Sequence, residues 1–492
     1  MTRFFILYIS LFLLLACNQS DSSSNTTTGN SLTHSDKTPK ENISWAGFPN
    51  LTEVSVSIQK HQQVFFEKYL LPWSINKNQL PQFLDHQWIP GKDSTYATNN
   101  FLGQKNDWYG ENKQLYPENI KQRIAQNADF SGFPNFFHKG ITVNHTDLRR
   151  LPTEKPGYGT YSQAGEGFPF DYFQETSVWA NTPVLLLQLS LDRQWAYVIT
   201  SFYKGWVPFK DLAIVDEPFI NQWKGGEFAF VVKDHFPIHS SDGISGLNGR
   251  IGMVLPVKSS AQNQVTVYLP VIGNDHKAIL KEADIDQGNI RTGFSQMNET
   301  LIKSMAQDMV GQAYGWGGFM GNRDCSSTIR DFLTPFGIWL PRNSTDQAIY
   351  GDVVAGKNYD LSQFHSREEK IQFIKEKGIP FLTILWMRGH AMLYIGNDST
   401  GMPLILHSKW ALKTVYPETE NLNQITANYP VEGIHKTTSA DEKTGKEITQ
   451  FVGRRLIGKT VITSVNFDQV YDDLKSYIID DIIKMAVLVA EN

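Results

Sequence analysis

One cysteine in the second half of the chain has the surroundings of a catalytic nucleophile. Cys325 follows a glycine-rich aromatic loop and is flanked by Asp324 and Ser326. The apolar residues that come next recur at the i, i+3, i+4 and i+7 spacing of a helix with one buried face: Ile329, Phe332, Leu333 and Phe336. Because Asp324 and Ser326 stand where a helix N-cap belongs, we expect Cys325 in the first turn of that helix.

That position would suit a reactive thiol. Free N–H groups and the helix dipole favour negative charge at a helix N-terminus, so we expect the pKa of Cys325 to be lowered. The same N–H groups could stabilise an oxyanion. The alternative is an inert buried cysteine, which the polar neighbours on both sides make less favoured.

A thiolate nucleophile needs a base, and two of the 12 histidines stand in a suitable pattern. His390 begins a strand-like run, Asn397 to Gly401 form a turn, and His407 lies in the second strand. A hairpin centred between Ser399 and Thr400 places His407 opposite Met392. The two imidazoles are then diagonal neighbours on one face, one serving as base and the other as its orienter. A register shift of one residue would separate them, leaving two unrelated histidines.

The whole chain bounds the classes of protein that could hold such a site. It has 492 residues, 41% of them hydrophobic, which indicates three or four packed domains and excludes a wholly disordered chain. A net charge of -5 argues against a nucleic-acid partner. Two cysteines are too few for a disulfide framework, a zinc ribbon or an iron–sulfur cluster. A single bridge between Cys17 and Cys325 stays possible.

The first residues read as an export signal followed by a tether. Residues 1–16 combine one charge, Arg3, with an apolar run too short to span a bilayer. The run that ends Ala16-Cys17 resembles the lipobox of bacterial lipoproteins, which implies acylation of Cys17 and a membrane anchor. Residues 17–43 are polar and predict a flexible tether. We therefore expect an extracytoplasmic protein, held to a membrane in the periplasm or at the cell surface. A plain signal peptide is the alternative.

The remaining chain divides into segments with different helical and strand patterns, which together predict an α+β, multidomain arrangement. Residues 44–138 mix short helical patterns, such as 58–71, with irregular segments, whereas 139–216 and 217–296 are rich in short strands. Residues 297–425 begin with an amphipathic helix and hold the candidate site. Residues 426–492 form an extension with a strand near 451–456 and a helical pattern over 468–489. We expect this extension to be a packing or capping element, although an interaction role is an alternative.

Residues 139–216 resemble the bacterial SH3-like barrels attached to cell-wall peptidases. The matching segments are Asp147 to Thr153, Pro169 to Gln174 and Gly205-Trp206-Val207-Pro208. Residues 217–296 resemble a more divergent barrel of the same kind, which suggests a degenerate repeat. Ordinary packing of a β-barrel would also explain many of these aromatic residues.

Residues 301–412 resemble the catalytic domain of the NlpC-like cell-wall cysteine peptidases, which have a papain-like fold. Five segments match in order and spacing: Tyr314 to Gly318, Asp324 to Ser327, Leu340 to Ser344, Gly389 to Gly396, and His407-Ser408. The resemblance implies hydrolysis of peptidoglycan stem peptides, typically between γ-D-glutamate and the diamino acid. With SH3-like domains, it also implies stems that have a free N-terminal L-alanine. It implies neither a metal nor an organic cofactor.

The resemblance also assigns roles by position. Cys325 would be the nucleophile, His390 the general base and acid, and His407 the orienting residue. Asp324 would pair with the substrate amine, a charge-assisted contact. The residues expected to line the groove are Ser326, Tyr314, Trp316 and Ser344, with Tyr172 and Asp171 from the first SH3-like barrel.

Two departures from the family pattern and two other functions stay open. Ser327 stands where the family commonly has glycine, and Asn343 stands where it has aspartate, which could alter how Arg342 is held. A non-catalytic domain that binds wall fragments is one alternative, although it would not need Cys325 and both histidines. An amidase or transpeptidase is another, because it would use the same thioester.

Overall fold

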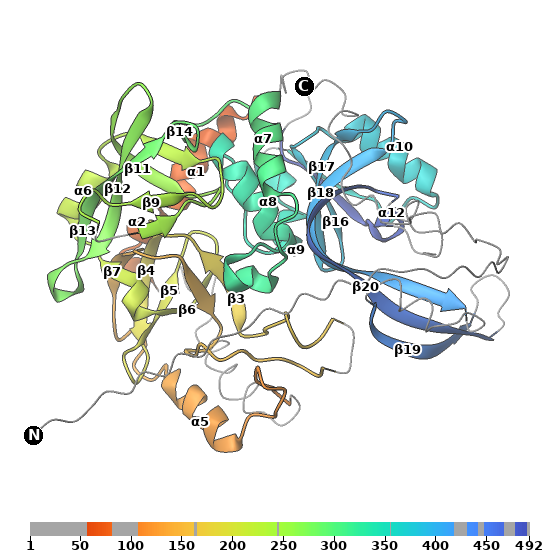
Figure 1. The fold of residues 1–492 in the computed structure, drawn as a ribbon, viewed down its shortest axis with the longest axis horizontal. Helices are drawn as coiled ribbons and strands as arrows, with labels where there is room; N and C mark the ends of the chain where they lie inside the picture. The colour runs from red at the N-terminus through yellow and green to blue at the C-terminus, as the bar shows by residue number, and fades with distance from the viewer. Residues whose placement is uncertain are drawn as a thin grey trace, which may run out of the picture. The chain divides into compact units, whose positions relative to one another are not determined.

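A computed structural model gives the fold of most of the chain (Figure 1). It describes residues 57–80, 107–161, 165–243, 246–354, 356–417, 431–440, 447–466 and 478–489. The expected signal peptide, Cys17 and the tether lie outside these residues. Within them, no helix is both long enough and apolar enough to cross a membrane.

The N-terminal helices are part of the packed body. α1 (Gln59–Tyr69) fulfils the helical prediction for 58–71, and α2 (Leu71–Ser74), the 3₁₀ turn η2 (Lys77–Gln79) and α5 (Glu118–Asn127) follow. Phe65 and Tyr69 of α1 are buried in one cluster with Trp223 and Phe230 from the strand-rich region that follows. A broad aromatic stripe on α1 therefore docks this helix against the β domains.

The first strand-rich region is a seven-stranded antiparallel sheet in the order β3-β2-β6-β5-β4-β1-β7. Its central strands β4 and β5 are buried along their whole length, which explains their unbroken apolar sequence. Short strands predominate in this region, as its sequence predicts. The strands are β1 (His138–Thr142), β2 (Thr146–Arg149), β3 (Gln174–Val178), β4 (Pro183–Leu189), β5 (Trp195–Ile199), β6 (Lys204–Pro208) and β7 (Leu212–Ile214).

The second strand-rich region follows the short helix α6 (Glu217–Lys224), which Asp216 caps. Its five-stranded sheet has the order β13-β12-β11-β8-β14, and a small hairpin pairs β9 with β10. The buried side chain of Trp179, from the first region, packs in the core of this second sheet. The strands are β8 (Phe228–Val231), β9 (Pro237–His239), β10 (Gly246–Asn248), β11 (Val254–Ser260), β12 (Gln264–Ile272), β13 (Ala278–Asp286) and β14 (Ile290–Thr292).

The third region combines helices with a second seven-stranded sheet, in the order β15-β21-β16-β17-β18-β20-β19. Helix α8 (Cys325–Leu333) packs against β17 and β18 in the centre of that sheet. The helices are α7 (Glu299–Met309), α8, α9 (Ser344–Gln347), α10 (Arg367–Lys377) and α12 (Ile478–Asp481), with 3₁₀ segments η6 (Trp316–Gly321), η7 (Thr334–Phe336) and η8 (Gly351–Val354). The strands are β15 (Lys357–Asp360), β16 (Thr383–Met387), β17 (His390–Asn397), β18 (Pro403–Pro417), β19 (Val431–Ala440), β20 (Glu447–Ser464) and β21 (Lys484–Val487).

The residues after 425 are built into this sheet. The strand expected near 451–456 is confirmed as part of β20, which pairs with β18 along most of its length. The helix expected over 468–489 is wrong in its last part. Residues 484–487 form β21, between β15 and β16, and Met485 to Val487 are fully buried there. A short apolar run of this kind does not distinguish a buried strand from a helix. Residues 467–477 lie outside the description.

Candidate active site

Cys325 is the first residue of α8, as its sequence context predicts. The Asp324 side chain accepts a hydrogen bond from the Ser327 backbone N–H (3.0 Å), and the Ser327 hydroxyl accepts one from the Asp324 N–H (2.9 Å). This reciprocal capping box fixes the start of the helix. The apolar stripe that ends with Leu333 is completely buried. The helix is thereby held so that Cys325 faces β17, where the Ala391 N–H donates to its sulfur.

The two predicted histidines lie side by side on neighbouring strands. The register of β17 and β18 pairs Leu393 with Leu406, so Met392 lies opposite His407, as the hairpin argument expects. Nε2 of His390 and Nδ1 of His407 are 2.9 Å apart, and both residues are buried. Because this contact occupies Nε2 of His390, its Nδ1 is the nitrogen that remains for the proton of the thiol.

The histidine pair continues to a residue that the sequence reasoning missed. Nε2 of His407 is 3.0 Å from the Thr463 hydroxyl, which is contributed by β20. If His390 accepts a proton on Nδ1, its Nε2–H donates to Nδ1 of His407, and the Nε2–H of His407 donates to Thr463. A single tautomer of each ring therefore satisfies the whole chain. No local motif marks Thr463, because its place depends on the pairing of β18 with β20.

The expected lowering of the Cys325 pKa is not found. Burial raises the pKa of the thiol to about 11, and the neighbouring Asp324 carboxylate adds to the effect. The N–H donors of Ala391 and Ser326 oppose this shift without overcoming it. Burial also lowers the pKa of His390 well below its usual value, with smaller effects in the same direction from Lys409 and His407. In the resting site the nucleophile and base are therefore neutral, and the proton moves only when a substrate is attacked.

Asp324 is held from the side opposite to the helix by Arg342. The guanidinium donates to the carboxylate (2.6 Å), to the Ser326 hydroxyl (2.7 Å) and to the Thr176 hydroxyl of β3 (2.7 Å). Burial alone would raise the pKa of Asp324, but Arg342 and the Ser327 donors outweigh it and the net shift is downward. Both carboxylate oxygens are occupied, since Oδ2 accepts from Arg342 and from the Gly317 N–H (3.1 Å), and Oδ1 accepts from the Ser327 N–H. Direct pairing of Asp324 with a substrate amine would have to displace one of these donors.

The two departures from the family pattern leave this arrangement intact. Asn343 is exposed and contacts Asp346, so the hydrogen bonds of Arg342 do not involve the side chain of residue 343. Ser327 uses its hydroxyl to close the capping box. Ser344, at the start of α9, is partly buried and lies 3.4 Å from the indole nitrogen of Trp386.

Aromatic side chains from the first β region and the third region meet at one end of the site. The ring centroids of Trp316 and Phe170 are 5.3 Å apart, and those of Trp316 and Tyr172 are 6.2 Å apart. Trp410 lies 5.9 Å from both Phe170 and Tyr314. The hydroxyl of Tyr314 is close enough to Asp324 and Cys325 for their charge to raise its pKa, although burial is the larger cause. Tyr314, Trp316 and Tyr172 are thus brought together as expected.

Asp171 is not in the groove, and its assignment there is wrong. Its side chain has no exposure, accepts from Arg149 (2.6 Å) and accepts the N–H groups of Gly157 and Phe173. It therefore organises the interior of the first β region. The carboxylate beside the aromatic residues is Glu166, which accepts a hydrogen bond from the Tyr172 hydroxyl (2.8 Å). The sequence reasoning missed Glu166 because nothing in the local pattern distinguishes it from other loop acids.

The glycine-rich loop before Cys325 docks directly on β3. Ser177 donates to the Gly318 carbonyl (2.5 Å) and Gln174 to the Gly317 carbonyl (3.2 Å). Gly318 has a φ of +85°, and a Cβ there would lie 2.4 Å from the Ser177 oxygen. Only glycine permits this close approach.

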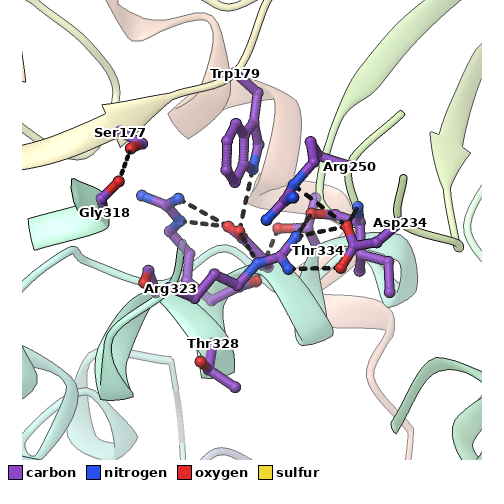
Figure 2. A network of polar contacts seen from close by, with 12 residues as sticks. Ser177, Trp179, Asp234, Arg250, Gly318, Arg323, Thr328 and Thr334 are labelled. Atoms are coloured by element: carbon purple, nitrogen blue, oxygen red, sulfur yellow. Dashed lines mark hydrogen bonds and ion pairs between the residues drawn. The ribbon is translucent and has the colours of Figure 1, made fainter. Parts of the chain in front are cut away.

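Behind the nucleophile, a buried ionic cluster joins all three regions (Figure 2). Arg323 donates to both oxygens of Asp234, at 2.6 and 3.0 Å, and to Asp331 at 2.7 Å. Asp234 belongs to the second β region, where its carboxylate also accepts a hydrogen bond from the backbone N–H of Ile251 (2.7 Å). The Trp179 indole donates to Asp331 (3.1 Å) and lies under Arg250 and Arg323. The residue that precedes Asp324 is therefore fixed by a carboxylate from another part of the chain.

Three family models match this chain. Residues 156–208 match an SH3 domain of the SH3b1 type, residues 216–262 match an SH3 domain of the SH3b2 type, and residues 311–416 match the NlpC/P60 family. The first match lies in the first β region, the second lies in the second β region, and the third contains Cys325, His390 and His407. No curated protein matches the chain.

One solved structure shares the fold over nearly the whole chain. An NlpC/P60 endopeptidase from Photobacterium damselae subsp. piscicida is 23% identical, with a TM-score of 0.72 over 91% of this chain and 96% of that one. At this identity the similarity establishes a shared fold. An NlpC/P60 family protein from Bacillus cereus ATCC 10987 is 19% identical, covers 48% of this chain and 73% of that one, and has a TM-score of 0.34.

The matched models and the geometry of the site agree on one identity. NlpC/P60 proteins are cysteine peptidases that act on peptidoglycan, and the matched segment holds the cysteine and both histidines. The chain therefore carries an NlpC/P60 cysteine peptidase domain, preceded by two bacterial SH3 domains.

Proposed function

We propose that the enzyme hydrolyses the bond between γ-D-glutamate and the diamino acid in peptidoglycan stem peptides that have a free N-terminal L-alanine. The observation that carries this proposal is the Tyr172–Glu166 pair beside Trp316. It brings a carboxylate and an aromatic wall from the SH3b1 domain to one end of the groove. A carboxylate beside aromatic side chains suits a short substrate that ends in an ammonium group.

Glu166 is better placed than Asp324 to receive that amine. The oxygens of Asp324 already accept hydrogen bonds from Arg342, Gly317 and Ser327, whereas Glu166 is partly exposed and, among the described residues, accepts one hydrogen bond, from Tyr172. Asp324 then supports the amine site from behind, by fixing Arg342 and the start of α8. This division of roles accounts for both carboxylates.

The reaction follows from the neutral resting pair. The Cys325 sulfur attacks the γ-carbonyl of D-glutamate while its proton passes to Nδ1 of His390, and N–H groups at the start of α8 stabilise the oxyanion. His390 returns the proton to the amine of the diamino acid as the C–N bond breaks, which leaves a thioester on Cys325. Water, deprotonated by His390, hydrolyses the thioester and releases L-Ala-γ-D-Glu. His407 and Thr463 hold the ring of His390 throughout.

Mass spectrometry with a synthetic stem peptide tests this function. The wild type should release L-Ala-γ-D-Glu from L-Ala-γ-D-Glu-diaminopimelate, and Cys325→Ala should release none. The N-acetylated peptide should be cleaved at least about tenfold more slowly, because acetylation removes the charge that Glu166 would bind. Equal cleavage of both peptides would contradict the amine site, and no cleavage of either would contradict the proposed bond.

We also propose that Cys17 is acylated and tethers the domains to a membrane outside the cytoplasm. The support is the lipobox-like sequence and the polar segment after it. Cys17→Ser should move the protein from the membrane fraction to the soluble fraction with its peptidase activity intact. Retention of the variant in the membrane fraction would refute the anchor.

A further inference from the structure

Lys409 is a cation beside the catalytic residues that the mechanism above does not use. It follows His407 by two residues on β18, so both side chains leave the strand on the same face. The side chain is largely removed from solvent. Among the described residues, none forms a hydrogen bond or ion pair with its ammonium group.

Other buried cations of this domain have partners. Lys370 donates to three backbone carbonyls, those of Ile479, Asp480 and Ile482, at 2.8 to 3.3 Å. Arg342 and Arg323 are each paired with carboxylates at 2.6 Å. A buried charge without such a partner loses its hydration without compensation. Within the described part of the chain, no carboxylate or carbonyl contacts the ammonium group of Lys409 as it does in these other cations.

The ammonium group of Lys409 lies within electrostatic reach of the reacting atoms. Burial lowers its pKa to about 8; the thiolate form of Cys325 has the largest opposing effect, followed by Asp481. Lys409 in turn lowers the pKa of both His390 and His407. A second cation, Arg454, adds to the repulsion that Lys409 experiences. An anion that enters the site would relieve this unfavourable charge.

The substrate class proposed above supplies such an anion. A γ-linked glutamate keeps its α-carboxylate free, and only three carbons separate that carboxylate from the carbonyl under attack. We infer that Lys409 binds this α-carboxylate. It thereby selects stems in which the α-carboxylate of D-glutamate is free over stems in which that carboxylate is converted to an amide. This inference rests on the proposed function. Lys409 would then be a specificity residue that contacts the substrate next to the scissile bond.

Binding measurements test the inference without any need for turnover. In a Cys325→Ala background, calorimetry compares L-Ala-γ-D-Glu with its α-amide, L-Ala-γ-D-isoglutamine. A charge-assisted contact should favour the acid by roughly tenfold or more. Lys409→Gln should remove this preference while affinity for the amide changes by less than about threefold. Lys459 lies opposite Lys409 on β20 and provides the control. Lys459→Gln also removes one positive charge, but it should keep the preference for the acid over the amide.

Each outcome decides the inference. Equal binding of acid and amide, or a preference that survives in Lys409→Gln, would overturn it. A Lys409→Gln variant that loses affinity for both ligands equally would also overturn it, because such a residue acts on the site and not on the carboxylate. Thermal unfolding of each variant establishes that it is folded. Cleavage of the stem peptide by the wild type is scored separately, so failure of the proposed reaction is distinguishable from failure of this contact.

Discussion

The two SH3 domains contact the peptidase domain in different ways. The SH3b1 domain reaches the front of the catalytic residues, where Tyr172 approaches Trp316 and Thr176 supports Arg342. The SH3b2 domain reaches the back of the nucleophile helix, where Asp234 holds Arg323. Arg323 and Asp324 are adjacent in sequence, yet one is fixed by the second domain and the other, through Arg342, by the first. One SH3 domain thus contacts the aromatic residues and Arg342 beside the catalytic site, and the other supports the nucleophile helix.

The largest expected effect follows from removal of the SH3b2 contact. Asp234→Asn leaves Arg323 with a single carboxylate partner in a buried site, so we expect a loss of about 3 to 5 kcal/mol in the free energy of unfolding. Because Arg323 directly precedes Asp324 and Cys325, kcat should fall at temperatures where the variant is still folded. Denaturant unfolding and steady-state kinetics measure the two effects.

The matched control is Asp171→Asn, which disrupts an equally buried ion pair inside the SH3b1 domain. It should lower stability by a similar amount while the folded enzyme keeps its kcat. If Asp234→Asn and Asp171→Asn lower kcat equally, support of the nucleophile is not specific to the second domain and the comparison fails.

A smaller effect is expected where the SH3b1 domain supports Arg342. Thr176→Val removes the acceptor for Nε of Arg342 and leaves a buried N–H without a partner, at a cost of about 1.5 to 3 kcal/mol. We expect kcat/KM for the stem peptide to fall by roughly tenfold. Thr200→Val, which removes a hydroxyl used only within its own turn, should leave kcat/KM unchanged. Equal values of kcat/KM for the two variants would contradict a role for Thr176 in supporting Arg342.

The smallest expected effect concerns the junction between the two SH3 domains. His145 accepts the Ala180 N–H on Nδ1 and donates from Nε2 to the Asn248 carbonyl (2.6 Å). Burial, together with Arg250 and Arg323, lowers its pKa below the ordinary value of 6.5. The unfolded chain therefore binds the proton first, and this contribution to stability is lost as the pH falls below about 6.5.

His145→Gln should consequently show a shallower fall in melting temperature between pH 7 and pH 5 than the wild type, by roughly 1 to 2 °C. Differential scanning calorimetry at several pH values measures it. Parallel curves for the two proteins would mean that the junction does not titrate, and that the acid sensitivity resides in other buried histidines such as His390 and His407.

The parts of the site that depend on local pattern were predictable from the sequence. The helix that begins at Cys325 follows from its apolar spacing and cap, and the contact of His390 with His407 follows from strand alternation across a short turn. The raised pKa of Cys325 was not predictable in this way, because burial of the thiol depends on how the domains pack around it.

The parts that depend on distant pairing were not predictable. Thr463 joins His407 only through the pairing of β18 with β20, and Asp234 meets Arg323 across 89 positions of sequence. Asp171 and Glu166 are close in the chain, yet Asp171 pairs with Arg149 in the interior, whereas Glu166 contacts the Tyr172 hydroxyl beside the aromatic residues. Periodicity does not encode such contacts, since each is fixed by the arrangement of whole sheets.

The place of β21 has a consequence for the order of folding during synthesis. Residues 484–487 fill the space between β15 and β16, although about a hundred residues separate them from either strand. The SH3 domains can fold as they leave the ribosome, because their strands are complete by residue 292. The peptidase sheet must wait for one of its latest segments, so β16 keeps an open edge until then. The peptidase sheet is thus completed only after the strands of both SH3 domains have been synthesised.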